Sequence, residues 1–231
     1  MNYSSVIAID GPSGSGKSTI ARMVAKKLNL LYIDTGAMFR SLAYSLRSRG
    51  FEIDEPSMSQ VDAIKKQLAS LDFKYGQSEQ ELVVIDGENL TQTIREHQVS
   101  KLASQVSKIQ VVRDYLKEAQ RSIAGKNHCV MEGRDIGTVI FPNSYCKIFL
   151  TASAEVRAQR RFDQLRDKGD NQTTFETVLE DLKKRDDSDI NRATAPLKKA
   201  DDAVGLDTSD MDINQVIDEI VKISQSKQNL L

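Results

Sequence analysis

The stretch from Val6 to Leu28 constrains the fold more than any other part of the sequence. It begins with the apolar run VIAI, passes through Asp10 into the loop GPSGSGKST, and continues with apolar residues at helical spacing. A short solid apolar run predicts a buried strand, and apolar residues three and four apart predict an amphipathic helix. We therefore expect a strand, a glycine-rich turn and a helix in immediate succession.

The loop from Gly11 to Ser18 has the pattern G-x-x-x-x-G-K-S of a phosphate-binding loop. Its glycines let successive backbone N–H groups face one anion, and the following helix adds its dipole. Lys17 would reach the β- and γ-phosphates of a nucleoside triphosphate, and the Ser18 hydroxyl would ligate Mg²⁺ through them. A turn that binds nothing is the alternative, and the flanking strand and helix argue against it. The predicted ATP-binding residues are Gly11, Pro12, Ser13, Gly14, Ser15, Gly16, Lys17, Ser18 and Thr19.

Apolar runs and helical stripes alternate along most of the chain. Further buried strands are expected at residues 30–33, 128–133, 146–151 and 203–206, and a last helix around 213–221. Solid apolar strands that alternate with helices are typical of a parallel sheet covered on both faces. The predicted fold class is α/β, a three-layer α/β/α P-loop NTPase with a five-stranded parallel sheet.

Two segments depart from this alternation. The runs LDFKY and ELVVIDGENL, joined by the polar GQSEQ, predict an antiparallel hairpin. The segment from about 153 to 200 is strongly charged, and Thr173 with Glu176 fits a capping box for a helix there. The predicted organisation is a core of residues 1–59 and 106–231, a helical lid at about 153–192 within it, and a small α+β insert of 60–105.

Charge and composition limit the partners. The chain has 32 basic and 33 acidic residues, whereas nucleic-acid-binding proteins more often carry a basic excess, so we expect a small anionic ligand and no nucleic acid. No apolar run approaches the roughly 18 residues of a membrane span, and no secretory leader is visible, so a cytoplasmic protein without a membrane partner is expected. The two cysteines lack CxxC spacing and predict free core thiols. Nothing requires an oligomer, and we expect a monomer.

Arginines follow several predicted strand ends, where open α/β sheets bind ligands. The planar guanidinium suits phosphate oxygens, so these residues predict a second anion site. Solvated surface charges and a structural ion-pair network are the alternatives. The candidates are Arg40, Arg134, the set Arg185, Asp189 and Arg192 at helical spacing, and Arg157, Arg160 and Arg161 on one face of the lid.

The chain lacks the N-K-x-D guanine signature, the L-S-G-G-Q stretch of transporter ATPases and a Ser–His–Asp set. A phosphate acceptor is already ionised and needs no general base, so positioning and charge neutralisation can supply most of the catalysis. A hydroxyl acceptor would favour a nearby carboxylate, and Asp34 could play that part. A nucleoside monophosphate kinase, another small-molecule kinase and a nucleotide-dependent switch all stay open at this point.

Four stretches resemble bacterial cytidylate kinases in the same order and at similar separations: IDGPSGSGKST, YIDTGAMFRSLA, EGRDIGTVIFP and KKRDDSDINRATAPL. The resemblance covers nearly the whole chain. It implies transfer of the γ-phosphoryl group of ATP to CMP or dCMP with Mg²⁺, giving ADP and CDP or dCDP. It also implies a monophosphate-binding insert and an arginine-bearing lid, which fit the two irregular segments.

The resemblance also implies roles for single residues. Asp135 would accept a hydrogen bond from the N4 amine of cytosine and disfavour the carbonyl of uracil. Cytosine contacts fall on Ser104, Arg113 and Asp135, ribose contacts on Arg185 and Asp189, and acceptor phosphate contacts on Arg40, Arg134 and Arg192. The complete predicted CMP-binding set is Thr35, Phe39, Arg40, Ser104, Arg113, Arg134, Asp135, Arg185, Asp189 and Arg192. The predicted catalytic residues are Lys17, Arg134, Arg157, Arg161 and Arg192, with Arg157 and Arg161 near the transferring phosphoryl group.

Two positions depart from the family pattern. Phe39 stands where tyrosine is frequent, which keeps stacking and removes a hydroxyl, and Thr35 stands where some relatives have serine. Both leave the fine ribose preference open. Glu132 ends a predicted strand near the nucleotide, where a carboxylate that orients Mg²⁺-bound water and a purely structural carboxylate fit equally well.

Overall fold

The computed structural model describes residues 5–78, 80–125, 127–167 and 169–228. The chain divides into two compact units, Met1–Ile33 with Ala124–Leu231, and Asp34–Ile123. The insert predicted at 60–105 lies inside the second unit, which extends beyond it at both ends.

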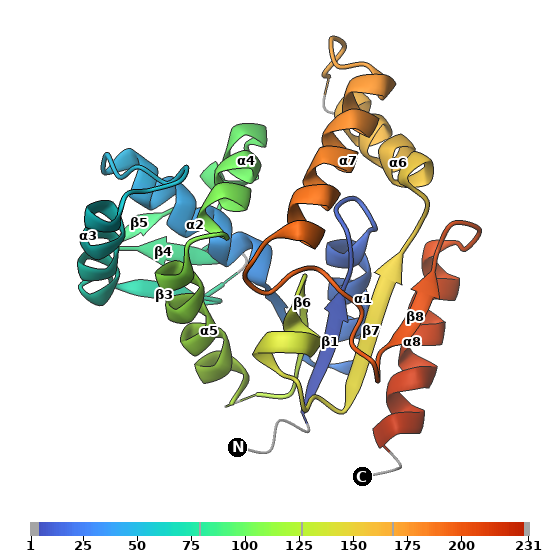
Figure 1. Cartoon of the computed structure of the whole chain (residues 1–231). Helices are drawn as coiled ribbons and strands as arrows, with labels where there is room; N and C mark the ends of the chain where they lie inside the picture. The colour runs from blue at the N-terminus through green and yellow to red at the C-terminus, as the bar shows by residue number, and fades with distance from the viewer. Residues whose placement is uncertain (1–4, 79, 126, 168, 229–231) are drawn as a thin grey trace. The chain divides into compact units, whose positions relative to one another are not determined.

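The first unit holds a five-stranded parallel sheet in the order β2-β6-β1-β7-β8 (Figure 1). All five residues of β1 are buried, so both faces of this central strand are covered. The predicted fold class and its five strands are confirmed. The strands are β1 (Val6–Asp10), β2 (Leu31–Asp34, whose last residue begins the second unit), β6 (Cys129–Gly133), β7 (Cys146–Thr151) and β8 (Val204–Asp207).

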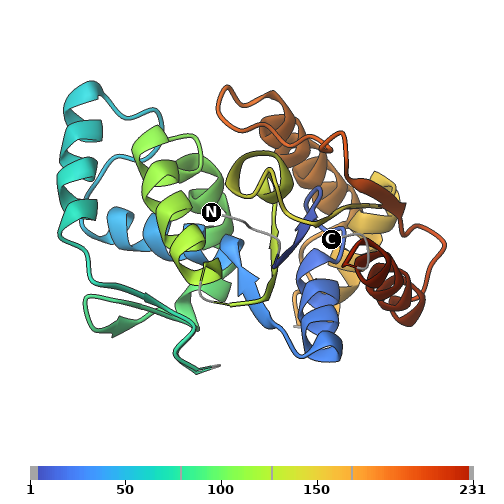
Figure 2. The ribbon, with the colours of Figure 1, turned by 90° about the horizontal axis from the view of Figure 1, so that it is seen from below.

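Helices α1 (Lys17–Leu28) and α8 (Ile213–Gln228) lie next to each other against this sheet (Figure 2). Alternate side chains of β1, Ile7 and Ile9, share one core cluster with apolar residues of both helices. The buried face of each helix is narrower than its apolar spacing predicts, because Met23 of α1 is 38% exposed and Ile213 of α8 is 52% exposed. Cys129 and Cys146 are free and buried, which confirms the prediction of core thiols.

The predicted lid segment forms two helices, α6 (Ala154–Asp167) and α7 (Phe175–Asn191), which pack against each other (Figure 1). They have a small core of their own around Ala158, Val178 and Leu182. The predicted capping box is wrong by one residue: Thr174 caps α7, and its Oγ1 accepts from the backbone N–H of Thr177 at 3.2 Å. Thr173 instead donates its hydroxyl hydrogen to Asp170 at 2.7 Å.

The second unit combines helices with a small antiparallel sheet of order β3-β4-β5. The predicted hairpin between the runs LDFKY and ELVVIDGENL is confirmed. The second run is two strands, because Asp86 and Gly87 both have positive φ, 49° and 83°, and form the tight turn that Asp-Gly favours. The elements are α2 (Thr35–Ser48), α3 (Met58–Ala69), β3 (Phe73–Tyr75), β4 (Val83–Ile85), β5 (Glu88–Asn89), α4 (His97–Val106) and α5 (Gln110–Ala124, whose last residue lies in the first unit).

Within the described residues, no helix has the length and apolar character that crossing a membrane requires.

Candidate active site

The phosphate loop connects β1 to α1 and lies tightly against the neighbouring strand β7. A Cβ atom at Gly11 would lie 2.0 Å from the Leu150 carbonyl oxygen, so only glycine lets the backbone pass. The local sequence thus places the loop at the carboxyl end of the central strand, as its pattern predicts.

Lys17 lies at the first position of α1 and is 5% exposed. Its ammonium donates to the Pro12 carbonyl oxygen at 2.6 Å and to Ser15 Oγ at 3.2 Å. Burial lowers the pKa of Lys17 well below its ordinary value, the positive charge of Arg134 lowers it further, and Glu132 opposes them. A buried lysine repelled by another cation forms a site that attracts an anion.

An ion-pair network joins four of the predicted site residues in the first unit. Arg134 Nε donates to Asp189 Oδ2 at 2.9 Å. Arg192 lies 3.9 Å from Asp189 and 3.5 Å from Asp135, measured between guanidinium nitrogens and carboxylate oxygens. Burial opposes the ionisation of Asp189, but the charges of Arg134, Arg185 and Arg192 hold its pKa below the usual range.

The network comes from two parts of the chain. Arg134 and Asp135 directly follow β6, and Asp189 lies on α7, as does the half-buried Arg185 one turn earlier. Arg192 is the first residue after α7 and has extended backbone, so it does not share the helical face predicted for it. It nevertheless reaches the same network, and its Nε donates to the Ala195 carbonyl oxygen at 2.7 Å.

Asp10, which the sequence reading did not select, fixes the backbone that follows Asp135. Its two carboxylate oxygens accept from the N–H groups of Ile136 at 2.8 Å and Gly137 at 2.7 Å, at the start of a π-helical turn. Burial raises the pKa of Asp10 to about 6, although both backbone donors oppose this. The sequence signal for this role is an acidic residue at the end of a predicted buried strand. Its hydrogen-bond partners could not be predicted, because they lie 126 and 127 residues further along the chain.

The second unit brings two predicted CMP-binding residues together. The Arg113 guanidinium lies over the Phe39 ring, 5.6 Å from its centroid, and its Nη1 donates to the Ser107 carbonyl oxygen. Asp34 Oδ1 accepts from the Ala37 N–H at the start of α2, and its Oδ2 pairs with Arg40 at 3.1 Å. These contacts give Asp34 a structural role and disfavour it as a general base. Of the other predicted residues, Thr35 is buried on α2 and Ser104 half-buried on α4.

The predicted lid arginines, Arg157, Arg160 and Arg161, lie at helical spacing on α6, but the contacts of Arg157 differ from those of Arg160. Arg157 bonds to Ala152, Ser13 and Asp186. Arg160 donates to the hydroxyl and carbonyl oxygens of Thr208, at 3.1 and 2.7 Å. Arg161 is half-buried. No common anion site of all three arginines is formed by these contacts.

Oxygen donors suited to Mg²⁺ lie near the phosphate loop. Ser18 exposes its side chain in the first turn of α1, and the Glu132 carboxylate is buried and accepts from the Tyr32 hydroxyl at 2.8 Å. Hydroxyl and carboxylate oxygens are the ligands that Mg²⁺ takes, so these residues fit the ion. The described residues include no group of three or more His, Cys, Asp or Glu side chains able to hold a metal alone. A magnesium ion here would therefore depend on the nucleotide phosphates.

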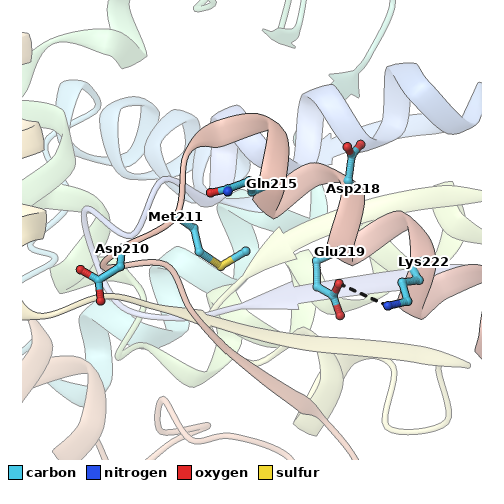
Figure 3. A pocket seen from close by; sticks show the side chains of 6 residues that line it. All are labelled: Asp210, Met211, Gln215, Asp218, Glu219 and Lys222. Carbon is cyan, nitrogen blue, oxygen red and sulfur yellow. Dashed lines mark ion pairs between the residues drawn. The ribbon is translucent and has the colours of Figure 1, made fainter.

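An open hollow of about 460 Å³ lies beside α8 (Figure 3). Three of its lining side chains are carboxylates, and one of them, Glu219, lies 4.0 Å from Lys222. Carboxylates repel phosphate, and no predicted site residue lines the hollow, so it is not a nucleotide site. Its lining residues are Asp210, Met211, Gln215, Asp218, Glu219 and Lys222.

The phosphate loop at the central strand of a parallel sheet, with a buried lysine among arginine charges, places the protein among the P-loop kinases. The family model described as cytidylate kinase matches residues 7–226. The cytidylate kinase of Pseudothermotoga lettingae is 44% identical over 219 residues, 95% of this chain and 93% of that protein. The cytidylate kinase of Clostridioides difficile is 44% identical over 226 residues, 97% and 98% of the two chains. The chain belongs to the cytidylate kinase family.

Among solved structures, shikimate kinase from Bacteroides thetaiotaomicron aligns over 97% of both chains, with a TM-score of 0.44 and 13% identity.

Proposed function

We propose that this protein transfers the γ-phosphoryl group of ATP to CMP or dCMP, giving ADP and CDP or dCDP, in pyrimidine nucleotide metabolism. The observation that carries the proposal is the cytidylate kinase family match over residues 7–226. The surroundings of Lys17 support it, because a bound polyphosphate would offset the burial and the repulsion from Arg134 that lower its pKa.

The proposed chemistry needs no acid or base from the protein. The phosphate of CMP is ionised near neutral pH, so positioning and charge neutralisation supply the catalysis. Lys17, Arg134 and Arg192 are the proposed sources of positive charge in the first unit, and Arg161 is proposed to act from the lid. Ser18 and the nucleotide phosphates would hold Mg²⁺, which supplies further charge neutralisation when bound.

The proposed CMP contacts follow the sequence prediction in each unit. In the first unit, Asp135 is proposed to accept from the cytosine amine, and the Arg192 guanidinium lies 3.5 Å from its carboxylate. In the second unit, the stacking of Arg113 on Phe39 supports an assignment to the base. The remaining proposed contacts are Arg134, Arg185 and Asp189 in the first unit and Thr35, Arg40 and Ser104 in the second.

A coupled ADP-release assay with ATP and Mg²⁺ tests the proposal, using CMP, dCMP, UMP, AMP and no acceptor. We expect strong turnover with CMP and dCMP and little with UMP. Equal rates with UMP would leave a kinase but contradict the base-reading role of Asp135. ATP hydrolysis that is independent of any acceptor would contradict the kinase proposal and support a nucleotide-dependent switch.

A kinase for a hydroxyl acceptor is the second candidate, and the engagement of both Asp34 carboxylate oxygens speaks against it. A monomeric state, a cytoplasmic location and the absence of nucleic-acid partners stay predictions from the sequence. Size-exclusion chromatography with light scattering would test the first of them.

A further inference from the structure

One residue of the phosphate loop, Ser13, is held on both of its backbone polar groups by the lid helices. Its N–H donates to Asp186 Oδ1 at 3.2 Å, and its carbonyl oxygen accepts from Arg157 Nη1 at 2.9 Å. Arg157 and Asp186 also pair with each other at 2.6 Å. We call these three residues the Ser13 bracket. Ser13 lies on the loop, Arg157 on α6 and Asp186 on α7. Along the sequence, Ser13 is 144 residues from Arg157 and 173 residues from Asp186.

The bracket is packed into the protein. The side chains of Arg157 and Asp186 are 8% and 13% exposed. A Cβ atom at Gly14, the next loop residue, would lie 3.3 Å from Arg157 Cβ and 3.5 Å from Leu182, so the lid helices lie directly on the loop. Arg157 Nε is itself fixed by the Ala152 carbonyl oxygen at 2.9 Å. Buried pairs of this kind are screened little by water and salt.

The bracket places a negative charge at the loop that is proposed to hold a triphosphate. A carboxylate within hydrogen-bond distance of a phosphate loop repels an anionic ligand unless a cation compensates it. Arg157 is the cation in contact with Asp186, and the ion pair leaves that end of the loop close to neutral. The charge of Asp186 is also felt at Arg134, where it favours the charged guanidinium.

We propose that Arg157 and Asp186 are a positioning pair, in which Arg157 neutralises Asp186 and the two together hold the phosphate loop in shape for the donor triphosphate. This assigns Arg157 a role different from the direct contact with the transferring phosphoryl group expected from the sequence. The inference rests on the proposed function only in taking ATP as the loop ligand, and it holds whatever the acceptor is.

A double-mutant cycle separates the two roles, because only neutralisation allows one substitution to repair the other. Arg157→Gln leaves a buried, uncompensated carboxylate beside the loop, and we expect the Kd for ATP to rise about tenfold or more. Asp186→Asn removes both the negative charge and its need for compensation, and we expect a rise of about threefold or less. In the double variant Arg157→Gln/Asp186→Asn, the Kd should return to within about threefold of the wild-type value.

The measurement is isothermal titration of the full chain with ATP and Mg²⁺ in the absence of any acceptor, followed by the KM for ATP, the KM for CMP and kcat. The KM for ATP should follow the Kd through the cycle, while the KM for CMP changes little. Since the titration contains no acceptor, missing activity toward CMP would contradict the proposed function and leave this test intact.

The chain offers a matched control on the same two helices. Glu155 of α6 and Lys183 of α7 pair at 3.3 Å with side chains 62% and 57% exposed, and neither residue belongs to the Ser13 bracket. Glu155→Gln, Lys183→Met and their combination should leave the Kd for ATP within about twofold, as expected for exposed ion pairs.

A double variant as weak in ATP binding as Arg157→Gln would overturn the proposal, because Arg157 would then act on the nucleotide itself. Thermal unfolding of each variant shows whether it is folded. Should Arg157→Gln not fold, Arg157→Lys carries the test, since lysine keeps the charge. Neutralisation then predicts a Kd within about threefold of the wild-type value, and a loss above about tenfold would contradict it.

Discussion

At the scale of single residues, Gly11 shows how closely the phosphate loop lies on the sheet. Its missing Cβ would meet a backbone carbonyl oxygen of β7 at 2.0 Å, and a sheet backbone cannot move aside as a side chain can. We expect Gly11→Ala to lower the free energy of unfolding by about 3 kcal/mol or more. Urea unfolding followed by circular dichroism measures it.

Gly169 provides the control for Gly11. It has a positive φ of 85°, but a Cβ atom there would meet nothing within 4 Å. Gly169→Ala should therefore cost only the backbone strain, about 1–2 kcal/mol. Equal losses for the two variants would show that the close approach of the loop to β7 contributes nothing.

Asp10 predicts a pH dependence of stability. Its folded pKa is raised from 3.8 to about 6 by burial, so between these values the folded state binds a proton that the unfolded state does not. The free energy of unfolding should therefore fall as pH rises from about 4 to about 6, and this residue contributes about 3 kcal/mol to the fall. Asp10→Asn should remove that contribution. Urea unfolding at several pH values compares the slopes, and identical slopes would contradict a raised pKa.

At the scale of elements, mutation of the residues at the start of α7 tests whether Thr174 or Thr173 caps this helix. Thr174 accepts from the backbone at the observed start, so Thr174→Ala should destabilise the protein by about 1 kcal/mol. Thr173→Ala removes one part-buried side-chain hydrogen bond and leaves the cap in place, so it should cost less than Thr174→Ala. A larger loss of stability for Thr173→Ala than for Thr174→Ala would support the capping box of Thr173 and Glu176 that the sequence predicts. Chemical denaturation distinguishes differences of this size.

Structural features that depend on neighbouring residues are predictable from this sequence, whereas contacts between distant residues are not. The strands and the phosphate loop were predictable, because apolar runs and glycine spacing are local signals. The cap of α7 was predicted at the wrong residue because threonine is an equally good cap at positions 173 and 174. Strand β5 was not predicted separately because the run ELVVIDGENL was treated as one strand, although it contains a turn. The pairing of Arg134 with Asp189 spans 55 residues, and that of Ser13 with Asp186 spans 173. No spacing rule connects such pairs until the strand order is known.

At the scale of the whole molecule, ligand binding should stabilise the fold. At a free ATP concentration one hundred times its Kd, the gain is about 2.7 kcal/mol, and a chain of this size then unfolds roughly 5–10 °C higher. Differential scanning fluorimetry with ATP and Mg²⁺ measures the shift. Equimolar adenosine is the control, because it lacks the phosphates that the loop is proposed to bind. A shift equal to that with adenosine would argue against phosphate recognition.

The lid makes a second prediction at this scale. Binding of both nucleotides should protect residues 153–192 from limited proteolysis, if these helices cover the bound phosphates. Mass spectrometry of the fragments locates the cleavage sites with ATP alone, CMP alone and both. Unchanged cleavage within that segment would contradict a covering role.

The two buried thiols allow local opening of the sheet to be measured without introducing a labelled residue by mutation. Cys129 lies on β6 opposite Val6, and Cys146 on β7 opposite Ile7, so each strand paired with β1 carries one sulfhydryl group. Burial raises the pKa of each to about 12, so neither forms reactive thiolate at neutral pH while the strands stay packed. The rate of modification by a thiol reagent thus reports how often each side of the central strand opens, and the two peptides give the two sides separately.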